Sequence, residues 1–193
     1  MKSPKILIID NDDSFTFNLL QLFESAGAKV EISKGSSKTP SHINDFHGIV
    51  FSPGPGVPSE FPKMFELLNE GSNVPILGIC LGMQAIASYF GAKLYRQDFV
   101  QHGQVHEVQV FAGVSELFQN LPQSFEVGLY HSWAVDPASI PDVLRVSCMS
   151  SQKVIMGLRH RTRNIEGFQF HPESFLTPYG KDMITNWLLT LSV

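Results

Sequence analysis

Residues 75–84 read PILGICLGMQ, and this stretch decides the fold. Its first five residues are typical of a buried apolar strand, and the residues from Leu81 onward are typical of the start of a helix. The glycines on either side of Cys80 permit a sharp reversal from strand to helix, because they carry no side chain that would block it. The stretch therefore predicts a nucleophile elbow, in which Cys80 stands at the end of a sheet.

A helix that begins at Leu81 would place its free backbone N–H groups and its positive dipole end beside Cys80. Such a position favours the thiolate form of a cysteine and offers hydrogen-bond donors to an oxyanion. The alternative is that Cys80 is a small buried apolar side chain, which is the commoner role of a cysteine after a strand. The flanking glycines, the turn and the helix start favour a nucleophile.

Apolar runs alternate with amphipathic segments in the first half of the chain. The runs predict strands at residues 5–9, 29–32, 48–51 and 74–79. We expect a helix after the first run, capped by Asp13 or Ser14 and ended by Gly27, and another helix over residues 61–68. This alternation predicts a mostly parallel open α/β sheet flanked by helices.

The second half has shorter apolar runs separated by turn residues. These runs predict mostly antiparallel strands, added to the parallel core, at residues 105–110, 125–130, 143–146 and 154–158. A further strand at residues 167–170 leads into His171, and a last helix spans roughly residues 179–191. Because no repeat, linker or low-complexity segment interrupts the chain, residues 1–193 are expected to form one domain.

Composition narrows the function classes. The net charge is −4 and no basic run occurs, which excludes nucleic acid and anionic membranes as partners. The two cysteines are far apart in sequence, so a disulfide framework is not expected and a reducing cytoplasm is the natural setting. There is no signal-peptide pattern and no apolar run near the roughly 20 residues that span a bilayer, so we expect a cytoplasmic location.

A cysteine nucleophile needs a base, and histidine suits that role near neutral pH. His171 is the best partner for Cys80, because both residues follow strands and ligands of open α/β sheets bind beyond the carboxyl ends of the strands. In extended backbone, Glu173 would share a side with His171 and could hold the imidazole tautomer. A His-Pro-Glu tripeptide alone is a weak signal, and its weight comes from the pairing with the elbow.

Residues 52–58, SPGPGVP, form a stiff loop after a strand. Its exposed N–H groups at Gly54 and Gly56 could face an oxyanion opposite the N–H of Leu81. The alternative is an ordinary turn. The loop is not a phosphate loop, because no Gly-Lys-Ser/Thr follows it.

The other histidines and the second cysteine have simpler interpretations. His102 and His106 are four residues apart, but the region reads as strand and a zinc site is disfavoured, so no metal is expected. Cys148 lies in a strand-like run and is expected to be a structural residue. The remaining candidates are expected to be solvated surface histidines: His42, His47 and His160.

Three segments together resemble the class I, or triad-type, glutamine amidotransferases: residues 78–84 (GICLGMQ), 52–56 (SPGPG) and 169–174 (QFHPES). They occur in the family's order, and the resemblance covers essentially the whole chain. Two further segments resemble the branch that contains component II of anthranilate synthase and of para-aminobenzoate (aminodeoxychorismate) synthase: residues 9–19 (IDNDDSFTFNL) and 175–180 (FLTPYG).

The resemblance implies a reaction. Cys80 would attack the side-chain amide of L-glutamine while the backbone N–H groups of Leu81 and Gly56 hold the oxyanion. His171, oriented by Glu173, would deliver a proton to the departing ammonia, and water would then hydrolyse the thioester to glutamate.

The resemblance also implies a substrate pocket. Gln84 and the backbone around Ser132 and Trp133 would contact the amino acid end of glutamine, and Gly54 and Gly56 would line the same pocket. No metal or organic cofactor is implied. The chain departs from the usual family pattern at Met83, Leu129 and Trp133, which bears on partner identity and glutamine affinity and not on the reaction type.

The amidotransferase core takes up nearly all of the 193 residues, so the site that accepts ammonia is expected on another chain, a chorismate-using synthase subunit. One alternative is an amidotransferase subunit for another acceptor, such as guanylate synthesis, which the segment at residues 10–19 disfavours. Others are a non-catalytic regulatory scaffold and a free-standing cysteine hydrolase. The scaffold is disfavoured because Cys80, His171 and Glu173 are all present.

Overall fold

The structure is a computed structural model that describes residues 3–37, 43–70, 74–98 and 100–191. The first half contains β1 (Lys5–Asp10), α1 (Thr16–Ser25), β2 (Lys29–Lys34), β3 (Gly48–Phe51), α2 (Pro62–Asn69), β4 (Ile76–Ile79) and α3 (Leu81–Tyr89). The second half contains β5 (Leu94–Arg96), β6 (Gln104–Val110), β7 (Ser124–Leu129), β8 (Trp133–Val135), β9 (Leu144–Ser150), β10 (Ile155–His160), β11 (Ile165–Phe168) and α4 (Gly180–Leu189). Short 3₁₀ turns lie at Ile43–Asp45, Pro58–Glu60, Glu116–Phe118 and Pro137–Ser139.

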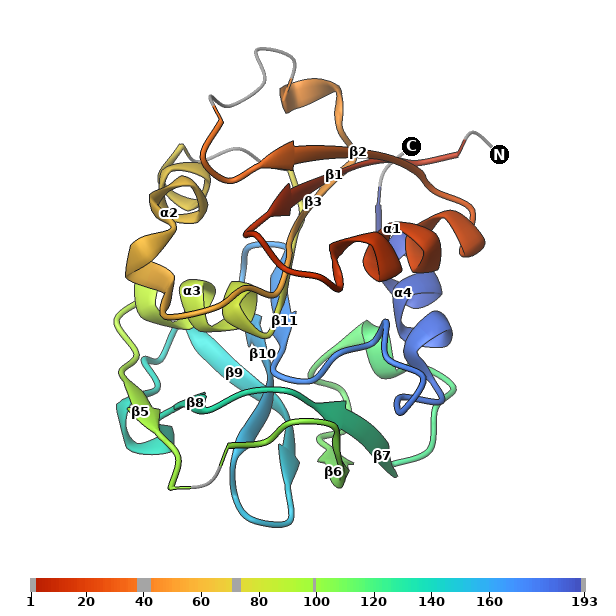
Figure 1. Ribbon diagram of the computed structural model, residues 1–193. Helices are drawn as coiled ribbons and strands as arrows, with labels where there is room; N and C mark the ends of the chain where they lie inside the picture. Colours follow the sequence, from red (N-terminus) through yellow and green to blue (C-terminus); the bar gives the residue numbers. More distant parts are fainter. Residues whose placement is uncertain (1–2, 38–42, 71–73, 99, 192–193) are drawn as a thin grey trace.

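One sheet runs through the molecule (Figure 1). Within the described residues its nine strands follow the order β2-β1-β3-β4-β11-β10-β9-β6-β7. The pairs from β2 to β11 are parallel, and the pairs from β11 to β7 are antiparallel. β5 and β8 form a separate antiparallel ribbon. The predicted parallel core with added antiparallel strands is therefore confirmed, and its order β2-β1-β3-β4-β11 is that of flavodoxin-like sheets.

Helices cover both faces of the parallel half (Figure 1), with α1 and α4 packed together on one side and α2 and α3 on the other. Alternate residues of β1 point to opposite faces. Ile6 and Ile8 join the cluster that contains Phe23 and Trp187, whereas Leu7 and Ile9 join a second cluster with residues of α2 and α3. Burial on both faces explains why these strands read as continuous apolar runs.

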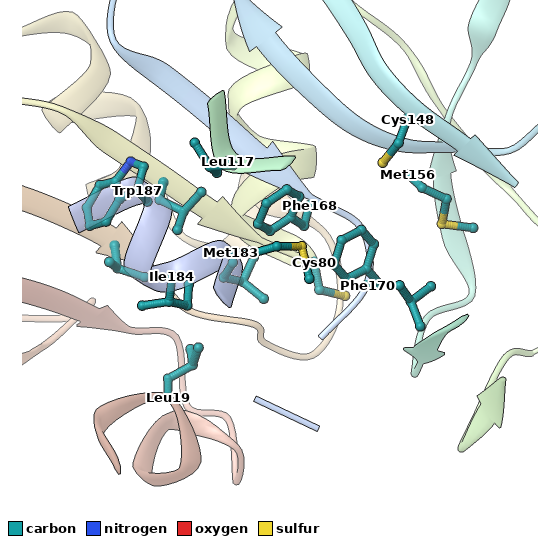
Figure 2. Packing of buried hydrophobic residues seen from close by; sticks show 14 of the residues in the cluster. Leu19, Cys80, Leu117, Cys148, Met156, Phe168, Phe170, Met183, Ile184 and Trp187 are labelled. Carbon is teal, nitrogen blue, oxygen red and sulfur yellow. The ribbon is translucent and has the colours of Figure 1, made fainter. Parts of the chain in front are cut away.

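The larger cluster passes beneath the predicted elbow and continues into the antiparallel half. Figure 2 labels Cys80, Phe168 and Phe170 among its members, together with Cys148 and Met156 from the antiparallel half. The rings of Phe168 and Phe170 stack with centroids 4.7 Å apart. Thus the same apolar core supports both cysteines of the chain.

Most predicted elements are confirmed, with differences at their ends. The expected strand at residues 167–170 already ends at Phe168, because the chain bends there and His171 donates its backbone N–H to the carbonyl of Gly128 in β7. The predicted cap of α1 is wrong. The Asp13 carboxylate accepts from the N–H of Phe15, one residue before the helix, and no side chain caps the helix itself. The short strands β5 and β8 were not predicted. In the described residues, no helix has the length and apolar character needed to cross a membrane.

Candidate active site

Cys80 forms the whole connection between β4 and α3, as the elbow predicts. Its backbone has φ 51° and ψ −103°, which a non-glycine residue adopts only under strain. The N–H of Cys80 donates to the carbonyl of Phe168 at 2.7 Å, which ties the apex to β11. A β-carbon on Gly78 would lie 2.5 Å from the carbonyl carbon of Gly82, so the turn closes only with glycine at these positions.

His171 and Glu173 lie in the turn that follows β11. The Nδ1 atom of His171 is 2.7 Å from Oε1 of Glu173, and both side chains are almost fully buried. A carboxylate only accepts, so Nδ1 carries the proton and donates it, and Nε2 is the ring nitrogen left for other chemistry. The expected pairing is found, although a turn and not extended backbone brings the two side chains together.

The surroundings of His171 favour its charged form. Burial opposes the imidazolium, but the Glu173 carboxylate and the sulfur of Cys80 outweigh it and raise the pKa of His171 well above 6.5. The Nε2 atom makes no hydrogen bond of standard geometry within the described residues. The influence of the Cys80 sulfur on this pKa nonetheless places the thiol and the imidazole within electrostatic reach of each other.

Two aromatic rings that the sequence did not single out fix the plane of this imidazole. The centroid of the His171 ring lies 5.5 Å from that of Phe15 and 4.9 Å from that of Tyr130. The hydroxyl of Tyr130 is 3.1 Å from Oγ of Ser174. The sequence could not predict these two contacts, because they depend on how the segments next to α1 and β7 pack against the His171 turn.

A pocket of about 130 Å³ opens at the carboxyl ends of β3 and β4. It is lined by Gly54, Pro55, Gly56, Cys80, Leu81, Gln84, Tyr130, His131, Ser132 and Trp133. Every predicted pocket residue is among them. The volume is below the roughly 300–1,000 Å³ of drug-sized sites, and it suits the side chain of one amino acid.

The glycine-rich loop packs directly on the elbow helix. A β-carbon on Gly54 would lie 2.6 Å from Cδ2 of Leu81 and 2.7 Å from the carbonyl oxygen of Asn11. Gly56 has φ 70°, and a β-carbon there would collide with the Glu60 carboxylate. That carboxylate accepts the N–H of Val57 at 3.1 Å. The loop is therefore a fixed wall of the pocket, which an ordinary surface turn would not be.

Gln84 points its amide across the pocket. Its Nε2 atom donates to the carbonyl of Trp133 at 2.9 Å and to Oε1 of Gln169 at 3.1 Å. Both amide hydrogens are used, which leaves the Oε1 acceptor of Gln84 for a ligand. The Nε2 atom of Gln169 also lies 3.4 Å from Sγ of Cys80, a contact that was not predicted although Gln169 belongs to one of the quoted segments.

His131 contributes a second buried imidazole. Its Nδ1 atom lies 2.9 Å from the carbonyl of Trp133, so Nδ1 carries a proton. Burial is the main reason why the pKa of His131 falls to about 4. His131 is therefore neutral at physiological pH.

The remaining histidines differ from expectation in one case. His160 was expected on the surface, but it is buried: its Nδ1 accepts the backbone N–H of Arg163 at 2.9 Å, and its ring packs on Phe90 at 4.6 Å. Burial and the Arg163 charge lower the pKa of His160. His47 is half-buried and accepts the N–H of Lys5, and His42 lies outside the described residues.

Among the described residues, no group of three or more His, Cys, Asp or Glu side chains is arranged to hold a metal ion. The ring of His102 instead packs edge-on against Tyr130 at 5.6 Å. Met83 and Leu129, which depart from the usual family pattern, are buried in the core. Of the three departures, Trp133 alone lines the pocket.

Comparison with known proteins agrees with this geometry. The family model described as "Glutamine amidotransferase class-I" matches residues 7–191. Aminodeoxychorismate synthase component 2 of Escherichia coli is 39% identical over 186 residues, which cover 95% of this chain and 98% of that protein. Anthranilate synthase component 2 of Mycobacterium tuberculosis is 38% identical over 190 residues, which cover 95% of this chain and 81% of that protein.

Solved structures share the fold. A candidate GMP synthase subunit from Thermoplasma acidophilum superposes with a TM-score of 0.86 at 28% identity, covering 97% of this chain and 94% of that one. A glutamine amidotransferase of Thermotoga maritima gives a TM-score of 0.77 at 18% identity, with 98% and 97% of the two chains covered. The chain belongs to the class-I glutamine amidotransferase family.

Proposed function

We propose that this chain is the glutaminase subunit of a chorismate-using synthase and supplies ammonia for anthranilate or aminodeoxychorismate synthesis. The observation that carries the proposal is a buried His171–Glu173 pair within electrostatic reach of Cys80, at a pocket the size of one amino acid side chain. The names of the relatives at 37–40% identity supply the acceptor class.

In the proposed reaction, the Cys80 sulfur attacks the carboxamide carbon of glutamine, and the oxyanion accepts hydrogen bonds from the N–H groups of Leu81 and Gly56. His171 gives its Nε2 proton to the leaving amine, so that ammonia departs and a γ-glutamyl thioester remains. Water then adds to the thioester, His171 takes up its proton, and glutamate leaves as the thiol is restored. Glu173 holds the imidazole in the tautomer that both steps need.

The pocket supports glutamine as the substrate. The free Oε1 of Gln84 is an acceptor, which suits the α-ammonium group at the amino acid end of glutamine. The backbone around Ser132 and Trp133 and the N–H of Gly54 would complete the contacts, and the narrow volume excludes much larger amides.

A second chain is proposed at the face that carries the His171 turn. Phe175 follows this turn and is 90% exposed, and Phe17 in the first turn of α1 is 69% exposed. Contact with a synthase subunit would remove this apolar surface from water. In the complex, Phe175→Asp should lower glutamine-dependent synthesis at least tenfold through lost association, while glutamine hydrolysis by the isolated chain stays within about twofold of wild type. A matching loss in both assays would place Phe175 in the chemistry and contradict the docking role.

The test mixes the purified chain with each candidate synthase subunit, chorismate and glutamine, and identifies the aminated product. Anthranilate with one partner only assigns the chain to that synthase, aminodeoxychorismate with the other assigns it there, and both products make it a shared ammonia donor. Mixing with a xanthylate-using synthetase, xanthylate and ATP tests the guanylate alternative, which the 28% identical structure motivates. Cys80→Ser is the control, and a failure of every partner to give product would refute the proposed acceptor class.

A further inference from the structure

We propose that Gln169 is a positioning residue that holds the sulfur of Cys80 and connects it to the wall of the glutamine pocket. This inference rests on the proposed function and adds a residue to it. Gln169 is fully buried and follows β11 directly. Its Nε2 lies 3.4 Å from Sγ of Cys80, and its Oε1 accepts from Nε2 of Gln84 at 3.1 Å.

The surrounding network decides which way both amides point. The carbonyl of Trp133 can only accept, so the amide nitrogen of Gln84 must face it. The same nitrogen reaches Gln169, and therefore the atom of Gln169 that faces Gln84 is its oxygen. The NH₂ group of Gln169 is then left to face the sulfur. The network of hydrogen bonds therefore requires that Gln169 directs an N–H donor at Sγ of Cys80.

The backbone on both sides of Gln169 is fixed. Its own N–H donates to the carbonyl of Met156 at 3.0 Å, and the neighbouring rings of Phe168 and Phe170 stack on each other in the core. The side chain is thus presented to the sulfur by a rigid segment. A donor held in this way needs no reorganisation when charge develops on the sulfur.

A hydrogen bond to the charged form of a group stabilises that form more than the neutral one. The N–H of Gln169 therefore favours the thiolate of Cys80 and keeps Sγ in one orientation. The chain of contacts from Trp133 through Gln84 to Gln169 also links the pocket wall to the nucleophile. A ligand that moves Gln84 would therefore also shift Gln169 and change its hydrogen bond to Cys80.

The test is the pH dependence of Cys80 alkylation by iodoacetamide, followed by mass spectrometry of the Cys80 peptide. Gln169→Met keeps the length of the side chain but removes the donor. We expect the midpoint of the pH profile to rise by roughly one pH unit and the rate below it to fall roughly tenfold, the effect of one hydrogen bond to a charged group. In glutamine hydrolysis, kcat should fall more than KM rises.

Two further variants keep the test decisive. Gln169→Glu keeps an acceptor for Gln84 but, when ionised, cannot donate to the sulfur. It should therefore also raise the midpoint of the pH profile, and it replaces the methionine variant if that variant does not fold. Gln119→Met, at an exposed position, is the matched control and should leave the profile unchanged. A folded Gln169 variant with a wild-type midpoint would overturn the inference.

Alkylation needs no glutamine, so the two proposals fail separately. If wild-type protein hydrolyses no glutamine but the Gln169 variants shift the midpoint, the proposed function is wrong and the positioning role stands. If hydrolysis depends on Cys80 but the midpoint does not move, the function stands and Gln169 is only structural.

Discussion

Cys80 and Cys148, the two cysteines of the chain, belong to the same apolar cluster and are both buried (Figure 2), with 6% and 0% of their surfaces exposed. Cys148 lies inside β9, between β10 and β6, and burial alone raises the pKa of its thiol far above the ordinary value. Cys80 stands at a strained apex beside a helix N-terminus, a pocket and the amide of Gln169.

The difference indicates that burial alone does not distinguish a structural cysteine from the proposed nucleophile. Reactivity needs stabilisation of the thiolate, which comes from polar groups and from the backbone geometry that presents the sulfur to them. At Cys148 burial acts alone and opposes the thiolate, whereas Cys80 lies within electrostatic reach of His171. The comparison can be tested by changing the same kind of feature at each cysteine.

Exchanging the proposed nucleophile, Cys80, should have the largest effect. In a complex with the synthase subunit, Cys80→Ser should lower glutamine-dependent synthesis by several orders of magnitude, as for loss of a triad nucleophile. Synthesis from added ammonium should survive, because the acceptor site is proposed to lie on the synthase subunit. Cys148→Ala should keep both activities within about twofold and lower the free energy of unfolding by about 1–2 kcal/mol. Loss of both the glutamine-dependent and the ammonium-dependent synthesis in Cys80→Ser would mean that Cys80 is needed for assembly of the complex. The proposed difference in reactivity between the two cysteines would then be unsupported.

The next largest effect concerns His171 and Glu173, which lie near Cys80 and not near Cys148. His171→Ala removes the proposed proton carrier and should lower glutamine hydrolysis by several orders of magnitude. Glu173→Gln should lower hydrolysis less, because in the proposed reaction the carboxylate orients the imidazole and does not transfer the proton. Steady-state hydrolysis by both variants measures this ranking. Equal losses would show that Glu173 does more than orient His171.

The sequence predicted the parts of the fold that depend on local pattern. The strands β1, β3 and β4, the helix start at Leu81 and the elbow all follow from apolar runs and glycine positions, which act over a few neighbouring residues. The burial of His160 could not be predicted, because it depends on the ring of Phe90, which is distant in sequence, and on a turn that brings the N–H of Arg163 back to the imidazole.

For the candidate site, the sequence predicted residues that the structure brings together, but not all of the hydrogen bonds that connect them. Cys80 and His171 could be paired because both follow strands whose ends meet at one edge of the sheet. The amide chain from Trp133 to Gln169 spans three separate segments. No local pattern specifies such contacts, since they depend on how β8, α3 and the end of β11 pack.

Adding one methyl group beside each cysteine gives a more balanced comparison. A β-carbon on Gly82 would lie 2.5 Å from the carbonyl oxygen of Phe51, and one on Gly157 would lie 2.8 Å from Sγ of Cys148. Both Gly82→Ala and Gly157→Ala should lower the free energy of unfolding by about 1–3 kcal/mol, the cost of overpacking. Gly82→Ala should also lower kcat at least tenfold, because the elbow shifts and misplaces the thiol. Gly157→Ala should keep kcat within about twofold, as measured on the folded fraction. An equal loss of kcat in both variants would contradict the view that only the surroundings of Cys80 affect the reaction.

The smallest effect is the pH dependence that Cys148 contributes to stability. In the unfolded chain its thiol loses its proton above about pH 9, whereas in the folded protein burial keeps it protonated. The folded state therefore binds more protons above that pH, and the free energy of unfolding falls as the pH rises, by up to about 1.4 kcal/mol per pH unit. Urea unfolding of wild type and Cys148→Ala between about pH 8 and pH 10 isolates this contribution, because the other titrating groups are common to both proteins. The stability lost by the substitution should shrink as the pH rises through this range. Parallel curves for the two proteins would mean that the Cys148 thiol ionises as readily in the folded protein as in the unfolded chain, and the two cysteines would then differ in geometry alone.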